Sequence, residues 1–474
     1  MRHSTGTLLA TAFAVLVAAC SRTPEPSTPA SVTESVSSLD ATALPNEAEA
    51  LPALPRPAGA SAVLDRNGQE LGWLRYESGE ASAVPLAVDA FDLIVDEATS
   101  SSSIEAALSV APGTPISTSI DLELQSLLQQ AVGQVPSTAG RFEVAAVAVE
   151  VATGAVVAVV DSSPGSSLAR LTRPTGSVLK FVVALAAIDA GVSERDLIDG
   201  AQRCSVPTSG DANAAPPLSF SGDDRFAPGE ISMITAFSVN CAFAKLHQIV
   251  GGDVVSSMAR QLGFDGVVDD SPRLVIGASD ASPLQMARAM SVVLGNGTLN
   301  RPGFVTAVDG DASAAIRVQQ SVVVDAATAA TTASLLRGVV EVGTASEFAL
   351  ADGRQGAGKT GTQENNTDAW FVGGTPELSI AVWIGNPADP SDSMVAVDEF
   401  VGVGRVQGGS YPAAVWKHFV DAALAGSSLS TWSVEQSSRQ PVQLVLPGLE
   451  CSAAPLLDVA FPAVAIDSNI IDCS

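Results

Sequence analysis

Lysine is scarce in this chain of 474 residues, which contains four lysines against twenty arginines. The lysines are Lys180, Lys245, Lys359 and Lys417. A guanidinium group stays protonated in proteins, whereas an amine can lose its proton once its pKa is lowered. A sequence that uses arginine almost everywhere else therefore indicates that its few lysines perform chemistry that arginine cannot.

Histidine and net positive charge are also lacking. The three histidines, His3, His247 and His418, have no metal-ligand spacing, and none is placed for Ser-His-Asp chemistry. We expect His247 and His418 to be surface or packing residues, and we expect no metal and no cofactor. The net charge of -27 argues against nucleic acid as a partner, because phosphates would be repelled. A solvated acidic surface is the simpler interpretation.

The first twenty residues have the pattern of an export signal. Arg2 and His3 precede an apolar run, residues 8–19, that is too short for a normal membrane span. The segment ends Leu16-Val-Ala-Ala-Cys20, which resembles a bacterial lipobox and implies cleavage before Cys20 with lipid attached there. An ordinary signal peptide with an incidental cysteine is the alternative. We expect an exported, lipid-anchored protein at the outer face of the cytoplasmic membrane or in the periplasm.

Composition divides the rest of the chain into four parts. Residues 21–57 are rich in Pro, Ser and Ala, which predicts a disordered tether. Residues 58–112 form a small segment that contains a hairpin turning at Asn67-Gly68. Residues 113–425 form the main domain, and residues 426–474 form a C-terminal tail to which the sequence assigns no role.

Four cysteines remain besides Cys20, an even number that suits disulfide bonding in an exported chain. Of the three possible pairings we prefer Cys204 with Cys241 and Cys451 with Cys473, on sequence proximity alone. Four buried free thiols are the alternative.

A helix is expected directly after Ser177. Pro174 and Gly176 break regular structure, and an apolar run rich in alanine and leucine then continues to Gly191. Ser177 falls at the helix start, and Lys180 lies over the same face three residues on. A hydroxyl becomes a nucleophile when a neighbour takes its proton, which an amine of lowered pKa can do. A lone serine-x-x-lysine spacing is more often an ordinary helix start with a snorkelling lysine.

Two further motifs change that interpretation. Ser238 and Asn240 form a serine-x-asparagine motif, and Lys-Thr-Gly-Thr follows at residues 359–362. The order S-x-x-K, S-x-N, K-T-G resembles the set used by penicillin-binding proteins and serine β-lactamases. Two apolar β runs within residues 144–160, turning at Thr153-Gly154, and segments downstream continue the resemblance over residues 113–425.

The chain is therefore similar to a transpeptidase of the class A penicillin-binding protein type. This resemblance implies a mixed α/β (α+β) fold of the penicillin-binding and β-lactamase type, in which an antiparallel sheet is covered by helices, with an all-α subdomain. Residues 58–112 weakly resemble the segment that precedes the glycosyltransferase of such proteins. Only about twenty residues separate Glu97 from Thr118, so we expect no glycosyltransferase between them.

The resemblance implies a role for the first two motifs. Ser177 would attack the penultimate D-Ala carbonyl of a peptidoglycan stem peptide and form an acyl-enzyme, with Lys180 as its base. Ser238 would relay protons to the leaving amine, and Asn240 would orient Lys180 and the substrate amide.

The third motif would hold the substrate. Lys359, as a cation of fixed charge, and the hydroxyls of Thr360 and Thr362 would bind the terminal carboxylate. Gly361 would let the substrate backbone approach the strand. The backbone N–H groups of Ser177 and Thr362 would make the oxyanion hole.

The implied partners are stem peptides ending in D-Ala-D-Ala, β-lactams as covalent inhibitors, the membrane through its lipid anchor, and a separate glycosyltransferase. Attack by water in place of an amine would make the protein a D,D-carboxypeptidase. A serine β-lactamase is disfavoured because no Glu-x-x-Leu-Asn segment follows Asn240 and the chain is longer than that enzyme needs. A membrane-tethered sensor or scaffold, acylated without useful turnover, is the alternative of another class, and the intact motifs argue against it.

Overall fold

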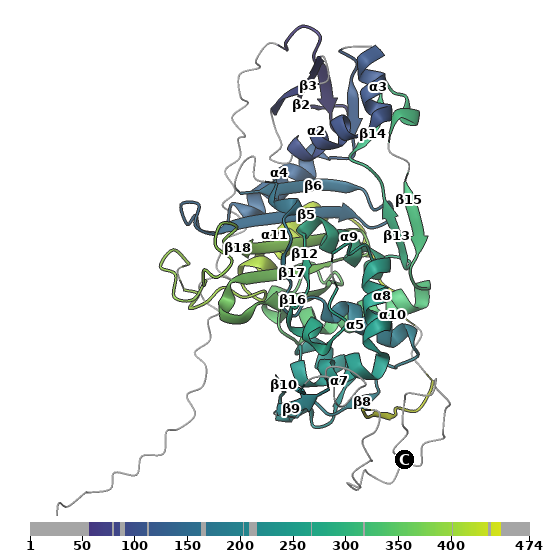
Figure 1. Cartoon of the computed structure of the whole chain (residues 1–474), viewed down its shortest axis with the longest axis vertical. Coiled ribbons are helices and arrows are strands. Elements are labelled where there is room, and N and C mark those ends of the chain that lie inside the picture. Colours follow the sequence, from purple (N-terminus) through teal and green to yellow (C-terminus); the bar gives the residue numbers. More distant parts are fainter. Residues whose placement is uncertain are drawn as a thin grey trace, which may run out of the picture.

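The computed structural model describes residues 56–77, 80–85, 91–110, 113–162, 167–201, 203–207, 216–266, 268–315, 318–400, 402–434 and 438–446. The lipid attachment expected at Cys20 and the bond expected between Cys451 and Cys473 lie outside these residues. Figure 1 shows three tiers, with a small N-terminal sheet above a central sheet and a mainly helical region below. Within the described ranges, no helix has both the length and the apolar character to span a membrane.

The central sheet has five antiparallel strands in the order β16-β17-β18-β5-β6. They are β5 (Glu143–Glu150), β6 (Val156–Asp161), β16 (Ala357–Thr362), β17 (Asp368–Gly374) and β18 (Leu378–Gly385). The two runs predicted about Thr153-Gly154 are β5 and β6, which pair with each other. Every residue of β17 and β18 is buried, as expected for strands covered on both faces.

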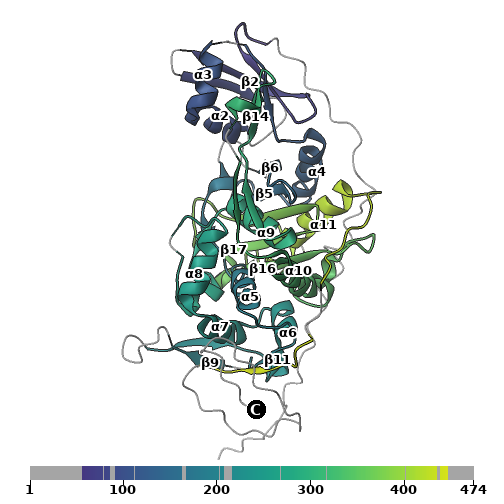
Figure 2. The same cartoon turned by 90° about the vertical axis from the view of Figure 1, so that its right-hand side faces the viewer.

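Helices cover both faces of the central sheet (Figure 2). One face packs against α4 (Leu122–Val132) and α11 (Tyr411–Ala423), and the other against α9 (Pro283–Leu294) and α10 (Ala326–Glu341). The helix α5 (Lys180–Asp189) packs against α10. Successive residues of β5 alternate between the two resulting cores, which is why its apolar run is continuous. The antiparallel sheet covered by helices is thus present as expected.

An aspartate side chain caps the start of α4. The carboxylate of Asp121 accepts hydrogen bonds from the N–H groups of Glu123 and Leu124 at the start of α4. These N–H groups have no partner within the helix, so the cap determines where α4 starts.

The lower tier is helical at its centre but is not all-α. Its helices are α6 (Ile231–Ala236), α7 (Asn240–Val250) and α8 (Gly252–Gln261). Two short ribbons lie below them, made of β9 (Arg203–Val206) with β10 (Leu218–Ser221), and of β8 (Leu197–Ile198) with β11 (Gly229–Glu230) and β19 (Gln443–Leu444). Because β19 pairs with β8, part of the C-terminal tail is bound to this tier.

The N-terminal sheet has the order β14-β4-β1-β2-β3. Its strands are β1 (Ser61–Leu64), β2 (Glu70–Glu77), β3 (Glu80–Pro85), β4 (Ile116–Thr118) and β14 (Val305–Val308). The predicted hairpin at Asn67-Gly68 joins β1 to β2. Two of the five strands, β4 and β14, come from outside residues 58–112, so the main domain shares this sheet.

Glu97 lies in α2 (Phe91–Ser100) and anchors this tier. Its buried carboxylate accepts hydrogen bonds from the N–H groups of Phe304 and Val305 at 2.8 and 2.9 Å. A buried carboxylate requires such partners, so Glu97 has a structural role where it connects the N-terminal segment to β14.

Shorter elements complete the described chain. They are α3 (Ser102–Val110), β7 (Arg173–Pro174), β12 (Asp280–Ala281), β13 (Thr298–Arg301), β15 (Gln319–Val322), and the 3₁₀ turns η1 (Leu168–Arg170), η2 (Asp224–Phe226), η3 (Pro272–Ile276), η4 (Ala312–Ala314), η5 (Ser346–Phe348) and η6 (Glu364–Asn366).

Candidate active site

Ser177 lies in the turn that precedes α5, and the first residue of the helix is Lys180. The N–H of Lys180 donates to the carbonyl of Ser177 at 3.3 Å, and the N–H of Phe181 donates to Val178 at 3.0 Å. These backbone hydrogen bonds from residue i to residue i−3 form a tight turn, and α5 follows directly from it. The spacing of three residues places Lys180 Nζ 3.0 Å from Ser177 Oγ, the proximity that the sequence predicted.

A buried ion pair holds the strand before this turn. Arg173 Nε donates to Asp368 Oδ1 at 2.9 Å, and the two side chains are 7% and 0% exposed. Trp383 Nε1 donates to the same oxygen at 3.0 Å, while Trp370 Nε1 donates to the Pro174 carbonyl at 2.9 Å. The nucleophile turn is therefore tied to β17 and β18. Sequence reasoning assigned no role to this pair, although a carboxylate opening an otherwise apolar strand was a signal.

Two glycines let the nucleophile turn lie directly against β16. A Cβ on Gly176, whose φ is +54°, would lie 2.8 Å from backbone atoms of Thr362. A Cβ on Gly361 would lie 2.4 Å from Val178 Cγ2 and 2.6 Å from the Thr175 carbonyl oxygen. The expected role of Gly361 in admitting substrate is therefore corrected. Its missing side chain would point into the protein, and the glycine is needed for packing between β16 and the turn.

Lys180 is fully buried among hydrogen-bond acceptors. Its Nζ donates to the Ser238 carbonyl at 2.8 Å and to Asn240 Oδ1. Those two oxygens can only accept, so they bind both N–H groups of a neutral amine and leave its lone pair for the hydroxyl of Ser177. Burial holds the pKa of Lys180 well below its ordinary value, and the charge of Lys359 lowers this pKa further. The geometry suits a general base.

The hydroxyl of Ser238 lies between the two buried lysines. Lys359 Nζ donates to Ser238 Oγ at 2.8 Å and to the Thr360 carbonyl at 2.9 Å, while Lys180 Nζ lies 3.1 Å from the same hydroxyl. A hydroxyl that contacts both amines can pass a proton between them. Burial lowers the pKa of Lys359 to about 7. Burial therefore weakens the fixed charge that we expected on Lys359.

The backbone N–H groups expected of an oxyanion hole are available at the edge of the sheet. β16 is an edge strand, and the N–H of Gln363 donates to the Asp368 carbonyl on its inner side at 2.9 Å. Bonding direction alternates along an antiparallel strand, so the N–H of Thr362 points outward. Within the described ranges the N–H of Ser177 has no backbone or side-chain acceptor.

A cavity of about 300 Å³ opens over these groups, lined by Ser177, Ser238, Thr344, Thr360, Thr362, Gln407 and Gly409. The motif residues thus meet at one cavity, with Lys180 and Lys359 buried beneath it. Thr344 Oγ1 lies 2.7 Å from Thr360 Oγ1, although sequence reasoning gave Thr344, Gln407 and Gly409 no role at the site. They lie in loops without periodicity, and only the tertiary fold returns them to β16.

The start of α7 is held by the ribbon below it. Asn240 Nδ2 donates to Ser221 Oγ on β10 at 3.2 Å, and a disulfide bond joins Cys241 to Cys204 on β9. This disulfide is one of the two that we preferred. It fixes the ribbon that supports Asn240 to the helix that begins with Asn240.

His247 is fully buried, and neither of its ring nitrogens has a hydrogen-bond partner among the described residues. Burial lowers its pKa to about 4, so it packs as a neutral ring. His418 is partly buried on α11. In the part of the chain that the structure describes, no cluster of three or more His, Cys, Asp or Glu side chains could hold a metal ion.

Comparison with known families identifies the same domain. The family described as "Penicillin binding protein transpeptidase domain" matches residues 144–398, slightly more than half of the chain. Penicillin-binding protein 2D of Bacillus subtilis (strain 168) is 23% identical over 330 residues, covering 66% of this chain and 46% of that protein. Penicillin-binding protein 1A of Mycobacterium tuberculosis (strain ATCC 25618 / H37Rv) is 27% identical over 359 residues, covering 68% and 41%. The chain spans less than half the length of these relatives.

Solved structures share the fold. The penicillin-binding protein PonA1 from Mycobacterium tuberculosis superposes with a TM-score of 0.59 at 24% identity, covering 73% of this chain and 94% of that one. The imipenem acyl-enzyme complex of penicillin-binding protein A from M. tuberculosis gives a TM-score of 0.58 at 22% identity, covering 77% and 98%. These likenesses confirm the expected fold class.

Proposed function

Because the chain belongs to the penicillin-binding protein transpeptidase family, we propose that it is a membrane-tethered D,D-transpeptidase that cross-links peptidoglycan stem peptides. The supporting observation is the contact of 3.0 Å between Ser177 Oγ and the buried amine of Lys180. Burial and the charge of Lys359 lower the pKa of that amine, which favours the neutral form that can take the hydroxyl proton.

In the first step Ser177 Oγ attacks the penultimate D-Ala carbonyl while Lys180 takes the hydroxyl proton. The N–H groups of Ser177 and Thr362 donate to the oxyanion that forms. As the C–N bond breaks, Ser238 passes a proton to the leaving amine, for which its contacts to both lysines support a relay. The products are an acyl ester on Ser177 and free D-Ala.

The terminal carboxylate is held beside this centre. Thr360 and Thr362 line the cavity, and Lys359 lies buried behind them, in contact with the Ser238 hydroxyl. A carboxylate bound there favours the protonated form of Lys359 and raises its pKa. Substrate binding should therefore restore the charge that burial weakens.

In the second step an amine from another stem peptide attacks the acyl ester and forms the cross-link, whereas attack by water would give D,D-carboxypeptidase activity. A β-lactam would acylate Ser177 in the same way, and the imipenem acyl-enzyme of a structural neighbour supports covalent inhibition of this chain.

We also propose lipid attachment at Cys20, on the sequence pattern alone. It would place the enzyme at the outer face of the cytoplasmic membrane or in the periplasm, where a separate glycosyltransferase would supply the glycan strands.

Intact-mass measurement tests the catalytic proposal. We expect one penicillin per chain on the wild-type protein and none on Ser177→Ala, while the control Ser232→Ala on α6 is labelled normally. A stem-peptide thioester with an amine acceptor should then give the cross-linked product. Undiminished labelling of Ser177→Ala would refute the assignment. An acyl-enzyme that releases no product would favour the sensor or scaffold.

A further inference from the structure

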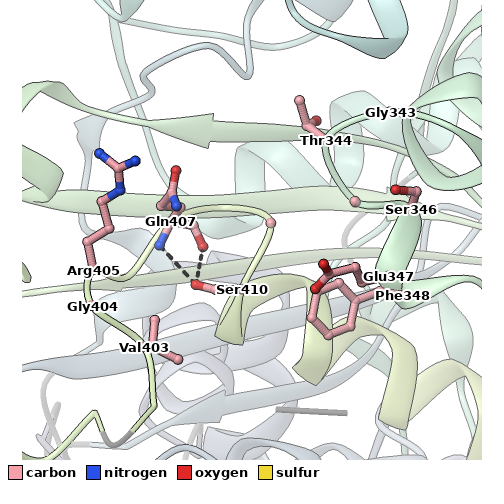
Figure 3. Close-up of a pocket in the computed structure, with 12 residues that line it drawn as sticks. Gly343, Thr344, Ser346, Glu347, Phe348, Val403, Gly404, Arg405, Gln407 and Ser410 are labelled. Atoms are coloured by element: carbon pink, nitrogen blue, oxygen red, sulfur yellow. Dashed lines mark hydrogen bonds between the residues drawn. The ribbon is translucent and has the colours of Figure 1, made fainter. Parts of the chain in front are cut away.

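Figure 3 shows a second cavity, of about 470 Å³. It shares lining residues with the active-site cavity. Two loops form it, residues 343–348 after α10 and residues 403–410 before α11. Thr344, Gln407 and Gly409 line both cavities, so the two lie side by side. Its volume falls in the range of small-molecule binding sites.

Under the proposed function, the second cavity adjoins the residues that hold the leaving group. Thr344 joins the two cavities, and its hydroxyl lies 2.7 Å from that of Thr360. Thr360 is one of the residues that we propose bind the terminal carboxylate. That carboxylate is part of the D-Ala that leaves. A group that takes the place of D-Ala would therefore extend past Thr344 into the second cavity.

The cavity presents two charges of opposite sign. Figure 3 shows Glu347 and Arg405 on its opposite sides, one from each loop. Both residues are exposed, and neither makes a hydrogen bond or an ion pair with another described residue. Each side chain is therefore free to bind a charge on a ligand.

The chemistry of the reaction limits which acceptor amines can bind beside the second cavity. An acceptor amine must occupy the position that the leaving amine vacates, because both bond to the same carbonyl carbon. The leaving D-Ala is a primary amine with a carboxylate on the same carbon. An acceptor that also carries an amine and a carboxylate on one carbon can bind through its carboxylate to the same residues. Its side chain then replaces the alanine methyl and enters the second cavity.

We propose that this cavity selects acceptors that carry an amine and a carboxylate on the same carbon together with a long, polar side chain. Cationic groups of that side chain bind Glu347, and anionic groups bind Arg405. The inference rests on the proposed function. The neutral amine attacks the ester carbon, the C–N bond forms and the C–O bond to Ser177 breaks. The amine proton passes through Ser238 and Lys180 to Ser177 Oγ.

The test is a competition between acceptors and water for one acyl-enzyme. The full-length protein is acylated with a stem-peptide thioester, and the released thiol reports acylation independently of the acceptor. D-Alanine, D-lysine and D-glutamate are then compared at equal concentration by the ratio of aminolysis to hydrolysis, measured by mass spectrometry. We expect D-lysine and D-glutamate to exceed D-alanine in the wild-type protein.

Two variants test the charges of Glu347 and Arg405 one at a time, and each variant is the control for the other. Glu347→Gln should lower the ratio for D-lysine relative to D-glutamate by about two- to fivefold, the effect of one exposed ion pair, and Arg405→Gln should do the reverse. Glu341→Gln and Arg195→Gln, which remove exposed charges outside the cavity, should leave all ratios unchanged.

Three results would be decisive. Equal preferences in the wild-type protein and both variants would overturn the acceptor inference, and so would a wild-type protein that prefers D-alanine. Absence of thiol release would instead refute the proposed function itself, so the two failures are distinguishable.

Discussion

The pH dependence of acylation tests how the two buried lysines divide their roles. Burial lowers the pKa of Lys180 well below its ordinary value and the pKa of Lys359 to about 7. Acylation requires a neutral Lys180, and the carboxylate grip requires a protonated Lys359. The second-order rate constant for acylation should therefore rise as Lys180 loses its proton and fall as Lys359 loses its proton near pH 7.

The charge of Lys359 should itself lower the pKa of Lys180. Both Nζ atoms lie within 3.1 Å of Ser238 Oγ, so they are at most about 6 Å apart. Two unit charges at that separation repel by about 3 kcal/mol at an effective dielectric constant near 20, which corresponds to about 2 units of pH. Removing the charge favours protonated Lys180, so its pKa rises and the acidic limb moves to higher pH.

Two substitutions of Lys359 separate charge from geometry. Lys359→Gln should move the acidic limb upward by about 2 units and abolish the basic limb. It should slow acylation by about 10- to 100-fold, because a hydrogen bond to a charged group contributes about 1.5–3 kcal/mol. Lys359→Arg stays protonated, so it should lose the basic limb but keep the acidic limb in place.

The assay measures the acylation rate with one penicillin across the pH range in which the protein stays folded. A basic limb near pH 7 that persists in both variants would assign that limb to another group. An acidic limb that does not move in Lys359→Gln would show that the charge of Lys359 does not act on Lys180. Either result would refute the division of roles.

Three further predictions concern the base, the ion pair and the anchor. Lys180→Arg should slow acylation by about 10²–10⁴-fold with no recovery at accessible pH, because arginine does not release its proton; recovery at high pH would exclude Lys180 as the base. Asp368→Asn leaves buried Arg173 unpaired, so it should lower the free energy of unfolding by about 3–5 kcal/mol in chemical denaturation. The control Asp392→Asn breaks a more exposed ion pair and should lower the free energy of unfolding by less than about 1 kcal/mol. Equal losses would contradict the anchoring role of the buried pair. Cys20→Ser should release the protein from membranes, and a variant that stays membrane-bound as an uncleaved chain would disprove lipid attachment.

Local sequence predicted the elements that carry the nucleophile and the base. Pro174 and Gly176 before an apolar run indicated the helix start, and the spacing of three residues placed Lys180 beside Ser177, as the distance of 3.0 Å confirms. These features depend on backbone geometry over a few residues, so they can be read along the chain.

Relations between distant segments could not be predicted in this way. Arg173 and Asp368 are 195 residues apart, and no periodicity connects them. The sequence predicted only a hairpin within residues 58–112, whereas β4 and β14 from outside that segment complete its sheet, because strand pairing depends on the path of the whole chain.

The residue types and their order by themselves indicated the family and the residues that we propose as nucleophile, base and substrate motif, because four lysines and three short motifs limit the chemistry. Only the tertiary structure decided how those groups act on one another. It turned the missing side chain of Gly361 toward Val178 instead of the substrate, and it buried Lys359 deeply enough to lower its pKa to about 7. It also set Glu347 and Arg405 on a cavity beside the nucleophile. Burial and side-chain direction depend on every element packed around a residue, and that information is not local in the chain.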